Sequence, residues 1–218
     1  MAKFSAGLTR KMTDLLSNPE WAILPTHNYL VIQKNANTYV RHVLKKFYKE
    51  SYYESKFIPI ENANNLCWTV LRNPYDRFIS GLSYDLWVTG GDIDHALSDL
   101  ENLINPRMSK LFMPTGKVEH TLSQLNYLLF RPVSFFVDIK DLTTFCYMNF
   151  GLQEENPDVK NPVTKDFKKV IEQEIIKRNL SQRINDLLSY ETNVYNKIKQ
   201  SDFIWRWQNG NVLGAVCD

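Results

Sequence analysis

Glycine is scarce in this sequence, with 8 residues among 218, about half of the usual ~7%. Phosphate-binding loops are commonly rich in glycine, so this scarcity at first argues against a loop of that kind. Cysteine is also scarce, with three widely spaced residues, Cys67, Cys146 and Cys217. Their spacing excludes a CxxC or Cys/His zinc motif and predicts ordinary buried thiols in a reducing compartment.

Long apolar runs and a large excess of charge are missing too. No apolar run approaches the ~20 residues that a membrane-spanning helix needs. The N-terminal residues lack the long apolar core and the small-residue cleavage site of a secretory signal. A net charge of +2 argues against bulk electrostatic binding to nucleic acid. We therefore expect a cytoplasmic protein with no nucleic-acid partner and no membrane span.

The size and composition of the chain are those of a globular protein. Its 218 residues are 44% hydrophobic and 23% charged, and a chain of this length buries a substantial core without disulfides or a structural metal. We expect a single domain over residues 1–218. Within it we expect an N-terminal helical extension at 1–25, binding motifs at 28–88 and C-terminal helices at 164–218.

Short apolar runs alternate with helical patterns along the chain. Strands are predicted at 29–32, 66–71 and 133–137. A helix is predicted after each strand, and two more are predicted at 164–178 and 181–200, where apolar residues recur three or four positions apart. This alternation predicts an α/β fold with a short parallel sheet that helices cover on both faces.

The first candidate site follows the strand at 29–32. The loop at 33–38 reads QKNANT and leads into a helix, whose N-terminus offers backbone N–H groups and the positive end of the helix dipole. Lys34 adds a charge and Thr38 a hydroxyl, so the loop can hold a phosphate or a sulfate. The P-loop pattern GxxxxGK(S/T) is absent. Taken alone, a strand, a loop and a helix with one lysine are as often purely structural.

The second candidate site follows the strand at 66–71. The segment 71–80 reads LRNPYDRFIS. Asn73 stands where an N-cap belongs, and Pro74 stands at the first helical position. The segment therefore predicts a helix that begins directly after the strand.

Arg72 lies at the end of this buried strand, where a guanidinium needs an anionic partner. Its spacing of eight residues from Ser80 lets both side chains converge on one phosphate. The polar face opposite the apolar stripe is expected to hold Asp76, Arg77, Ser80 and Tyr84. The alternative is a capped helix with a surface Arg–Asp pair.

Together, the two motifs resemble the donor site of sulfotransferases. The second motif is similar to the family's 3′-phosphate site, RxPxxRxxSxY, and matches its Arg, Pro, second Arg and Ser. The first is similar to the 5′-phosphosulfate loop PKxxxT, with Gln33 in place of the proline and Ala36 and Asn37 in place of common glycines. The stretches EHTLSQLNYLL and VSFFVDIKDLTTFCYMNFGL are similar to carbohydrate sulfotransferases related to the heparan 2-O- and chondroitin 4-O-enzymes.

The resemblance implies a P-loop-like three-layer sandwich and the donor 3′-phosphoadenosine 5′-phosphosulfate, with 3′-phosphoadenosine 5′-phosphate as product and no metal. The acceptor would be a hydroxyl or an amine on a small molecule or a glycan. Because the sequence shows no secretory anchor like that of the Golgi members of the family, we expect a cytoplasmic enzyme of bacterial or viral origin. Lys34 would contact the transferred sulfuryl group, backbone N–H groups of the loop the 5′-phosphate, and the Arg72 pair the 3′-phosphate. The donor-binding residues would be Lys34, Asn35, Ala36, Asn37, Thr38, Arg72 and Ser80.

The base that deprotonates the acceptor is open at this point. His120, one helical turn before Gln124, titrates near neutral pH, although a structural or acceptor-binding role fits it equally well. Glu54 is the other candidate, with an ordinary surface carboxylate as the alternative. A P-loop kinase and a non-catalytic nucleotide-binding protein of the same fold are the competing functions. The second is favoured by the glycine-poor loop and by the lack of an obvious base.

Overall fold

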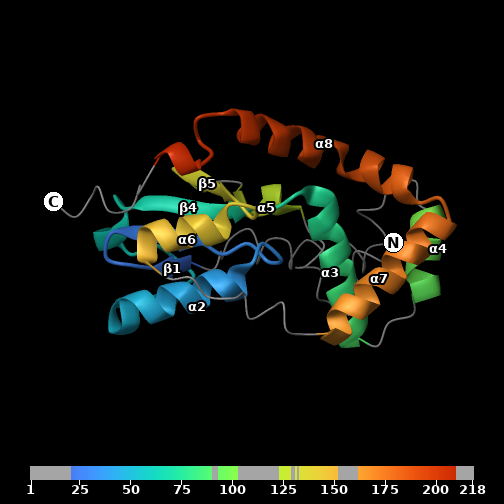
Figure 1. Cartoon of the computed structure of the whole chain (residues 1–218), viewed down its shortest axis with the longest axis horizontal. Coiled ribbons are helices and arrows are strands. Elements are labelled where there is room, and N and C mark those ends of the chain that lie inside the picture. Colours follow the sequence, from blue (N-terminus) through green and yellow to red (C-terminus); the bar gives the residue numbers. More distant parts are fainter. Residues whose placement is uncertain are drawn as a thin grey trace, which may run out of the picture. The chain divides into compact units, whose positions relative to one another are not determined.

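The computed structural model describes residues 21–89, 93–102, 123–128, 131, 133–151 and 162–209 (Figure 1). The chain forms two compact units, and each combines segments that are far apart in the sequence. The described residues of unit 1 lie within Met1–Leu71, Gln124–Glu155 and Ile198–Asp218, and those of unit 2 within Arg72–Ser123 and Asn156–Lys197. Unit 1 contains a β-sheet with helices, whereas the described part of unit 2 is helical.

The sheet of unit 1 has five strands in the order β3-β1-β2-β4-β5. Their bounds are Trp21–Ile23 for β1, His27–Leu30 for β2, Tyr53–Ser55 for β3, Leu66–Leu71 for β4 and Phe135–Asp138 for β5. Strands β2, β4 and β5 are parallel neighbours. Strand β1 runs antiparallel to both β2 and β3. The fold is therefore of the predicted α/β class, but its sheet is mixed.

The three predicted strands are the parallel ones, β2, β4 and β5, and their predicted bounds are right to within two residues. The two antiparallel strands were not predicted. Trp21–Ile23, assigned to the end of a helical extension, forms β1, and residues 1–20 lie outside the described residues. Tyr53–Ser55 is an edge strand with exposed or half-buried side chains, so it carries no apolar run that reveals it.

The core of unit 1 lies between the sheet and two helices, α2 (Asn37–Tyr48) and α6 (Leu142–Phe150), which lie side by side along the strands (Figure 1). Helix α2 buries Val40, Val43 and Leu44, whose spacing places them on one helix face, whereas Phe47 near its end is exposed. Burial of this apolar surface is the main source of stability for the unit. The strands and α6 contribute Tyr29, Trp68, Val70, Phe135, Val137, Phe145 and Cys146 to the same core.

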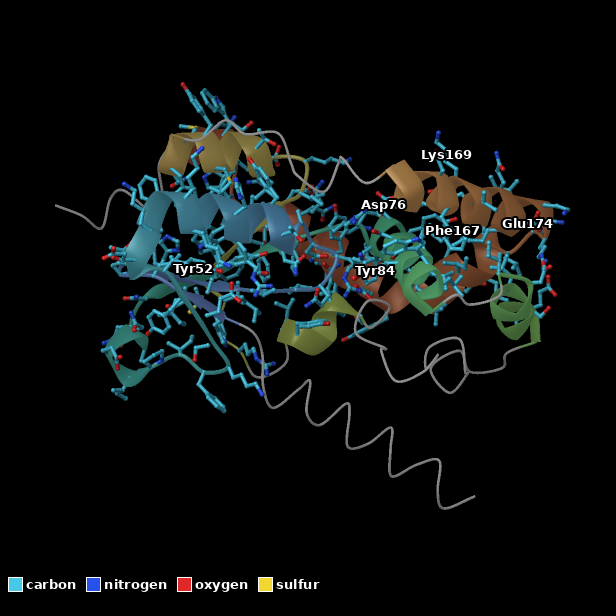
Figure 2. All side chains as sticks on the ribbon, turned by 90° about the horizontal axis from the view of Figure 1, so that it is seen from below. Tyr52, Asp76, Tyr84, Phe167, Lys169 and Glu174 are labelled. Atoms are coloured by element: carbon cyan, nitrogen blue, oxygen red, sulfur yellow. The ribbon has the colours of Figure 1, made fainter. Side chains whose placement is uncertain are left out.

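Unit 2 has a separate hydrophobic core built by α3 (Pro74–Thr89), α4 (Ile93–Asn102), α7 (Pro162–Lys177) and the first part of α8 (Ser181–Gln200). Helices α3 and α7 pack against each other. On α7, Phe167 packs on this core, whereas Lys169 is exposed and points away from it (Figure 2). The buried residues are Phe78, Ile79, Leu82, Leu86, Leu97, Ile171, Ile175, Leu180, Ile184 and Leu188.

Long helices with a clear apolar period were well predicted. The helix at 181–200 has the predicted bounds, and the helix at 164–178 begins two residues earlier. The short helices α4 and α5 (Gln124–Leu128) were not predicted. Among the helices that the structure describes, none has the length and hydropathy needed to cross a membrane.

Two of the three cysteines are described, and both are buried free thiols. Burial raises the pKa of the Cys67 thiol, and it raises the pKa of Cys146 to about 12. Thiols held in this protonated form are unreactive. The prediction of ordinary buried thiols is thus confirmed for these two residues, while Cys217 lies outside the described residues.

Candidate functional site

The loop at 33–38 turns the chain from β2 into α2 through two left-handed residues. Lys34 has φ 65° and Ala36 has φ 58°. The N–H of Asn35 donates to the Ile32 carbonyl at 3.2 Å and closes the turn. A left-handed conformation costs a residue other than glycine roughly 1–2 kcal/mol, so such residues persist only where surrounding structure supports them.

The same geometry exposes the N-terminus of α2. Ala36 is its N-cap and is left-handed, and the helix begins at the next residue, Asn37, with no hydrogen bond from a capping side chain. A left-handed residue followed by a right-handed one forms a concave nest of backbone N–H groups that favours anions. The first helical bond is donated by Val40 to the Ala36 carbonyl at 3.0 Å. The N–H groups of Ala36, Asn37 and Thr38 precede that bond, at the positive end of the helix dipole.

Asn35 is the predicted loop residue whose role the structure changes. It is fully buried, and its side-chain amide donates to the Val70 carbonyl at 2.7 Å and to Oε1 of Gln124 at 2.9 Å. Its backbone N–H, which was expected to contact a 5′-phosphate, is already bound within the turn. Asn35 therefore anchors the loop in this conformation, and its neighbours Lys34 and Ala36 adopt left-handed angles.

The second motif forms the predicted strand, cap and helix. Oδ1 of Asn73 accepts hydrogen bonds from the N–H groups of Tyr75 and Asp76 at 2.9 and 3.2 Å. Pro74 is the first residue of α3, as expected from its fixed φ and missing N–H. The cap lies directly after Arg72, which follows the last residue of β4.

Two guanidinium groups influence each other in this segment. Desolvation is the largest cause that lowers the pKa of Arg72, and the charge of Arg77 lowers it further, whereas Asp76 acts in the opposite direction. Arg77 is only 2% exposed, although the sequence placed it on the polar face of α3. The prediction of an exposed Arg77 is therefore wrong. Helical periodicity shows which face a residue lies on, but it does not show whether another segment of the folded chain covers that face. The segment therefore concentrates positive charge in a partly desolvated place.

The other predicted members of the polar face are less buried than Arg77. Ser80 is half-buried and Asp76 is exposed. Tyr84, which is labelled in Figure 2, is half-buried. Its ring centroid lies 6.1 Å from that of Trp87. Arg72 and Ser80 belong to unit 2, whereas the loop at 33–38 belongs to unit 1.

Glu54 lies on the edge strand β3 and is held by cations from α2. Nε of Arg41 donates to its carboxylate at 2.9 Å, and Nζ of Lys45 lies 3.3 Å from Oε1. Tyr52, labelled in Figure 2, donates its hydroxyl to the same carboxylate. The hydrogen bond from Arg41 is the main cause that lowers the pKa of Glu54 to about 2. A carboxylate this acidic is a weak base, so its setting does not fit the role of a proton acceptor.

The remaining candidate base, His120, lies outside the described residues. Its expected neighbour Gln124 is described, and it contacts the loop at 33–38 through Asn35. The sequence pointed to Gln124 only through the family resemblance, and no local pattern pointed to this contact. Among the described residues, no group of three or more His, Cys, Asp or Glu side chains is placed to hold a metal ion.

We compared the chain with protein-family models, with curated proteins and with solved structures, and found no match. The class of this protein therefore follows from its own fold and site. It is an α/β protein with a five-stranded mixed sheet flanked by helices. A helix whose N-cap, among the described residues, is bound by no capping side chain follows one of its parallel strands. A capped helix that contains Arg77 and comes directly after Arg72 follows another.

Proposed function

We propose that the protein is a sulfotransferase that binds 3′-phosphoadenosine 5′-phosphosulfate and transfers its sulfuryl group to a hydroxyl or an amine. The observation that carries this proposal is the loop at 33–38, where a left-handed N-cap without a capping side-chain hydrogen bond places the N-terminus of α2 beside Lys34. The parallel order of β2, β4 and β5 is compatible with the further proposal of a P-loop-like three-layer fold.

The loop at 33–38 is proposed to bind the 5′ end of the donor. The N–H groups of Ala36, Asn37 and Thr38 would bind the 5′-phosphate, joined by the exposed Thr38 hydroxyl. The Lys34 ammonium would neutralise charge that develops on the leaving phosphate. Asn35 would support this arrangement through the hydrogen bonds of its side chain, and its backbone N–H is already bound within the turn.

Arg72 and Ser80 are proposed to bind the 3′-phosphate. A phosphate dianion would offset the desolvation and the repulsion from Arg77 that now lower the pKa of Arg72. The Asn73 cap fixes the first turn of α3 and so holds the segment that carries both groups. This contact would distinguish the donor from ATP, which has no 3′-phosphate.

In the proposed reaction, the acceptor oxygen attacks sulfur while the bond between sulfur and the bridging phosphate oxygen breaks. The electron pair of that bond goes to the 5′-phosphate, and the acceptor proton goes to a base. The chain contributes mainly position and charge, as enzymes do in phosphoryl transfer. His120 is retained as the candidate base because Glu54 is engaged by Arg41. A carbohydrate is the proposed acceptor, on the family resemblance alone.

A non-catalytic nucleotide-binding protein is the second candidate. It is favoured by the lowered pKa of Glu54, which makes that carboxylate a weaker proton acceptor. It is also compatible with the donor loop, since binding alone needs no proton acceptor. Sulfuryl transfer by the wild-type chain decides between the two functions.

The donor is tested by thermal unfolding of the full chain with saturating 3′-phosphoadenosine 5′-phosphate or ATP. At about 100 times Kd, a ligand that binds only the folded state adds about 2.7 kcal/mol, or roughly 5–10 °C in a chain of this size. We expect this shift with 3′-phosphoadenosine 5′-phosphate and little shift with ATP. Stabilisation by ATP alone would overturn the sulfotransferase proposal.

The role of the loop is tested with Lys34→Ala, and Lys46→Ala on the exposed side of α2 is the matched control. We expect Lys34→Ala to abolish transfer from labelled donor with folding intact, and Lys46→Ala to retain it. Transfer that survives Lys34→Ala at the wild-type rate would remove the lysine from the mechanism. If the wild type transfers nothing to a panel of sugars and phenols but binds the nucleotide, the binding protein is the correct function.

A further inference from the structure

One buried residue separates the two left-handed residues of the donor loop. Lys34 and Ala36 have φ 65° and 58°, and Asn35 between them is 0% exposed. Neither flanking residue is a glycine, so the conformation opposes their intrinsic preference. The tertiary contacts of Asn35 therefore decide whether the loop keeps this shape.

Asn35 is bound to three different parts of unit 1. Its N–H donates to Ile32 in the turn, and its side-chain Nδ2 donates to the Val70 carbonyl of β4 and to Gln124 of α5. A backbone carbonyl only accepts hydrogen bonds, so Nδ2 must face Val70 and the orientation of the amide is fixed. The three bonds hold the residue from both its backbone and its side chain.

The contact between Asn35 and Gln124 is buried and specific. Gln124 is 1% exposed, and in the part of the chain that the structure describes, Oδ1 of Asn35 has no hydrogen-bond partner. An unpaired buried acceptor is unfavourable. The two bonds that Nδ2 donates nevertheless hold the Asn35 amide in one orientation against β4 and α5.

We propose that Asn35 and Gln124 are positioning residues of the donor loop. Their hydrogen bond keeps Lys34 and Ala36 left-handed, and thereby holds the Lys34 ammonium and the N–H groups at the start of α2 ready for an anion. The ligand part of this inference rests on the proposed function, but the conformational part does not. The loop is formed before ligand binds, and loss of either side chain loosens it.

The conformational part is tested by hydrogen exchange of the ligand-free full chain. The Val40 amide reports on the loop, because it is bonded to the Ala36 carbonyl. We expect Asn35→Ala and Gln124→Leu to speed its exchange at least tenfold, with the amides deeper in α2 unchanged. Gln124→Leu removes the acceptor but keeps the volume, so it decides the matter if Asn35→Ala does not fold.

The matched control is Asn37→Ala, which removes an amide bonded to Gln33 at 3.1 Å within the same loop. This variant should leave the exchange of Val40 near its wild-type rate. Unchanged exchange in Gln124→Leu, or equal acceleration throughout unit 1, would overturn the proposal.

The ligand part is tested by calorimetric titration with 3′-phosphoadenosine 5′-phosphate. We expect Asn35→Ala to weaken binding about tenfold, and Ala36→Gly in the same chain to restore most of the affinity, because glycine adopts the required φ without support. A structural defect elsewhere would not be rescued in this way, so failed rescue contradicts a positioning role. If the wild type binds no nucleotide, the proposed function fails, and the exchange rates still decide the role of Asn35.

Discussion

The loop at 33–38 holds Lys34 and Ala36 in a strained left-handed conformation, and the side chain of Asn35 between them supports it. Both residues adopt a conformation that glycine reaches freely, and the loop at 33–38 contains no glycine. The scarcity of glycine therefore does not prevent the turn from β2 into α2. In the absence of glycine, the hydrogen bonds of Asn35 hold the turn in its left-handed conformation.

This strain predicts that Ala36→Gly stabilises the protein. Glycine removes the conformational penalty of the left-handed angle, and this gain in free energy is larger than the loss caused by the greater entropy of the unfolded chain. We therefore expect the free energy of unfolding in urea to rise by about 1 kcal/mol. The matched control is Ala63→Gly, at an exposed right-handed position with φ −64°, which should cost about 0.5–1 kcal/mol. A loss of stability at both positions would show that Ala36 is not strained.

His27 is a fully buried histidine whose role could not be predicted from the sequence, and the structure shows its hydrogen-bond partners. Its Nδ1 accepts a hydrogen bond from the Trp68 indole at 2.8 Å, and its Nε2 lies 3.0 Å from the Tyr48 hydroxyl. Nδ1 therefore carries no proton, and Nε2 donates to Tyr48. Desolvation lowers the pKa of His27 to about 3, so the folded protein keeps the ring neutral.

The lowered pKa of His27 predicts a loss of stability in mild acid. Below pH 6.5, the ordinary pKa of histidine, His27 is protonated in the unfolded chain. In the folded chain it stays neutral down to about pH 3. The free energy of unfolding should thus fall between these values, by up to about 1.4 kcal/mol per pH unit. His27→Gln should flatten the slope between pH 6.5 and 5, whereas exposed His42→Gln should not. Equal slopes in all three proteins would contradict the assignment.

The ion pairs of Glu54 predict a structural role for that carboxylate. Its pKa of about 2 lies below the ordinary 4.5, so its contribution is complete above pH 4.5 and is lost between 4.5 and about 2. Because the pair is largely solvent-exposed, we expect Glu54→Gln to cost less than about 1 kcal/mol and to leave nucleotide affinity unchanged. Glu61→Gln is the exposed control. A Glu54→Gln variant that folds and binds but loses all transfer would restore Glu54 as the base.

At the scale of elements, the start of α3 depends on one side chain. Asn73 accepts from two N–H groups of the first turn, and Pro74 fixes the backbone at the first helical position. Local sequence determines this cap completely, which is why it could be predicted without knowledge of the fold.

The cap predicts that Asn73→Ala costs about 1 kcal/mol in urea unfolding, because two N–H groups lose their partner. Asn64→Ala, at an exposed turn, is the control and should stay within about 0.5 kcal/mol of the wild type. If the two variants lose equal stability, the cap makes no specific contribution.

The elements that could be predicted are those with their own periodic or capping signal. The stripe of Val40, Val43 and Leu44 and the long helix α8 are of this kind. Strands β1 and β3 have three residues each, and their pairing with β2 and with each other is decided by tertiary contacts. A segment this short carries too little pattern to be distinguished from a turn.

At the scale of the whole molecule, both candidate motifs begin directly after a parallel strand, and α/β proteins bind ligands beyond the carboxyl ends of such strands. The sequence could predict Lys34, Thr38 and Arg72, because each stands at a fixed distance from a strand end. It could not predict the burial of Arg77 or the contact between Asn35 and Gln124. These depend on segments up to 89 positions apart, which only the folded chain brings together.

The central claim is that Arg72 helps to bind a 3′-phosphate. It is tested most directly by comparing the affinities of two nucleotides. Calorimetric titration gives the Kd of 3′-phosphoadenosine 5′-phosphate and of adenosine 5′-phosphate for the wild type, for Arg72→Ala and for the control Lys169→Ala. Charge-assisted hydrogen bonds contribute about 1.5–3 kcal/mol, which corresponds to a preference of about tenfold to a hundredfold for the 3′-phosphorylated nucleotide. We predict that this preference is present in the wild type and in Lys169→Ala and is lost in Arg72→Ala. Equal affinities for both nucleotides in the wild type, or a preference that survives Arg72→Ala, would contradict the claim.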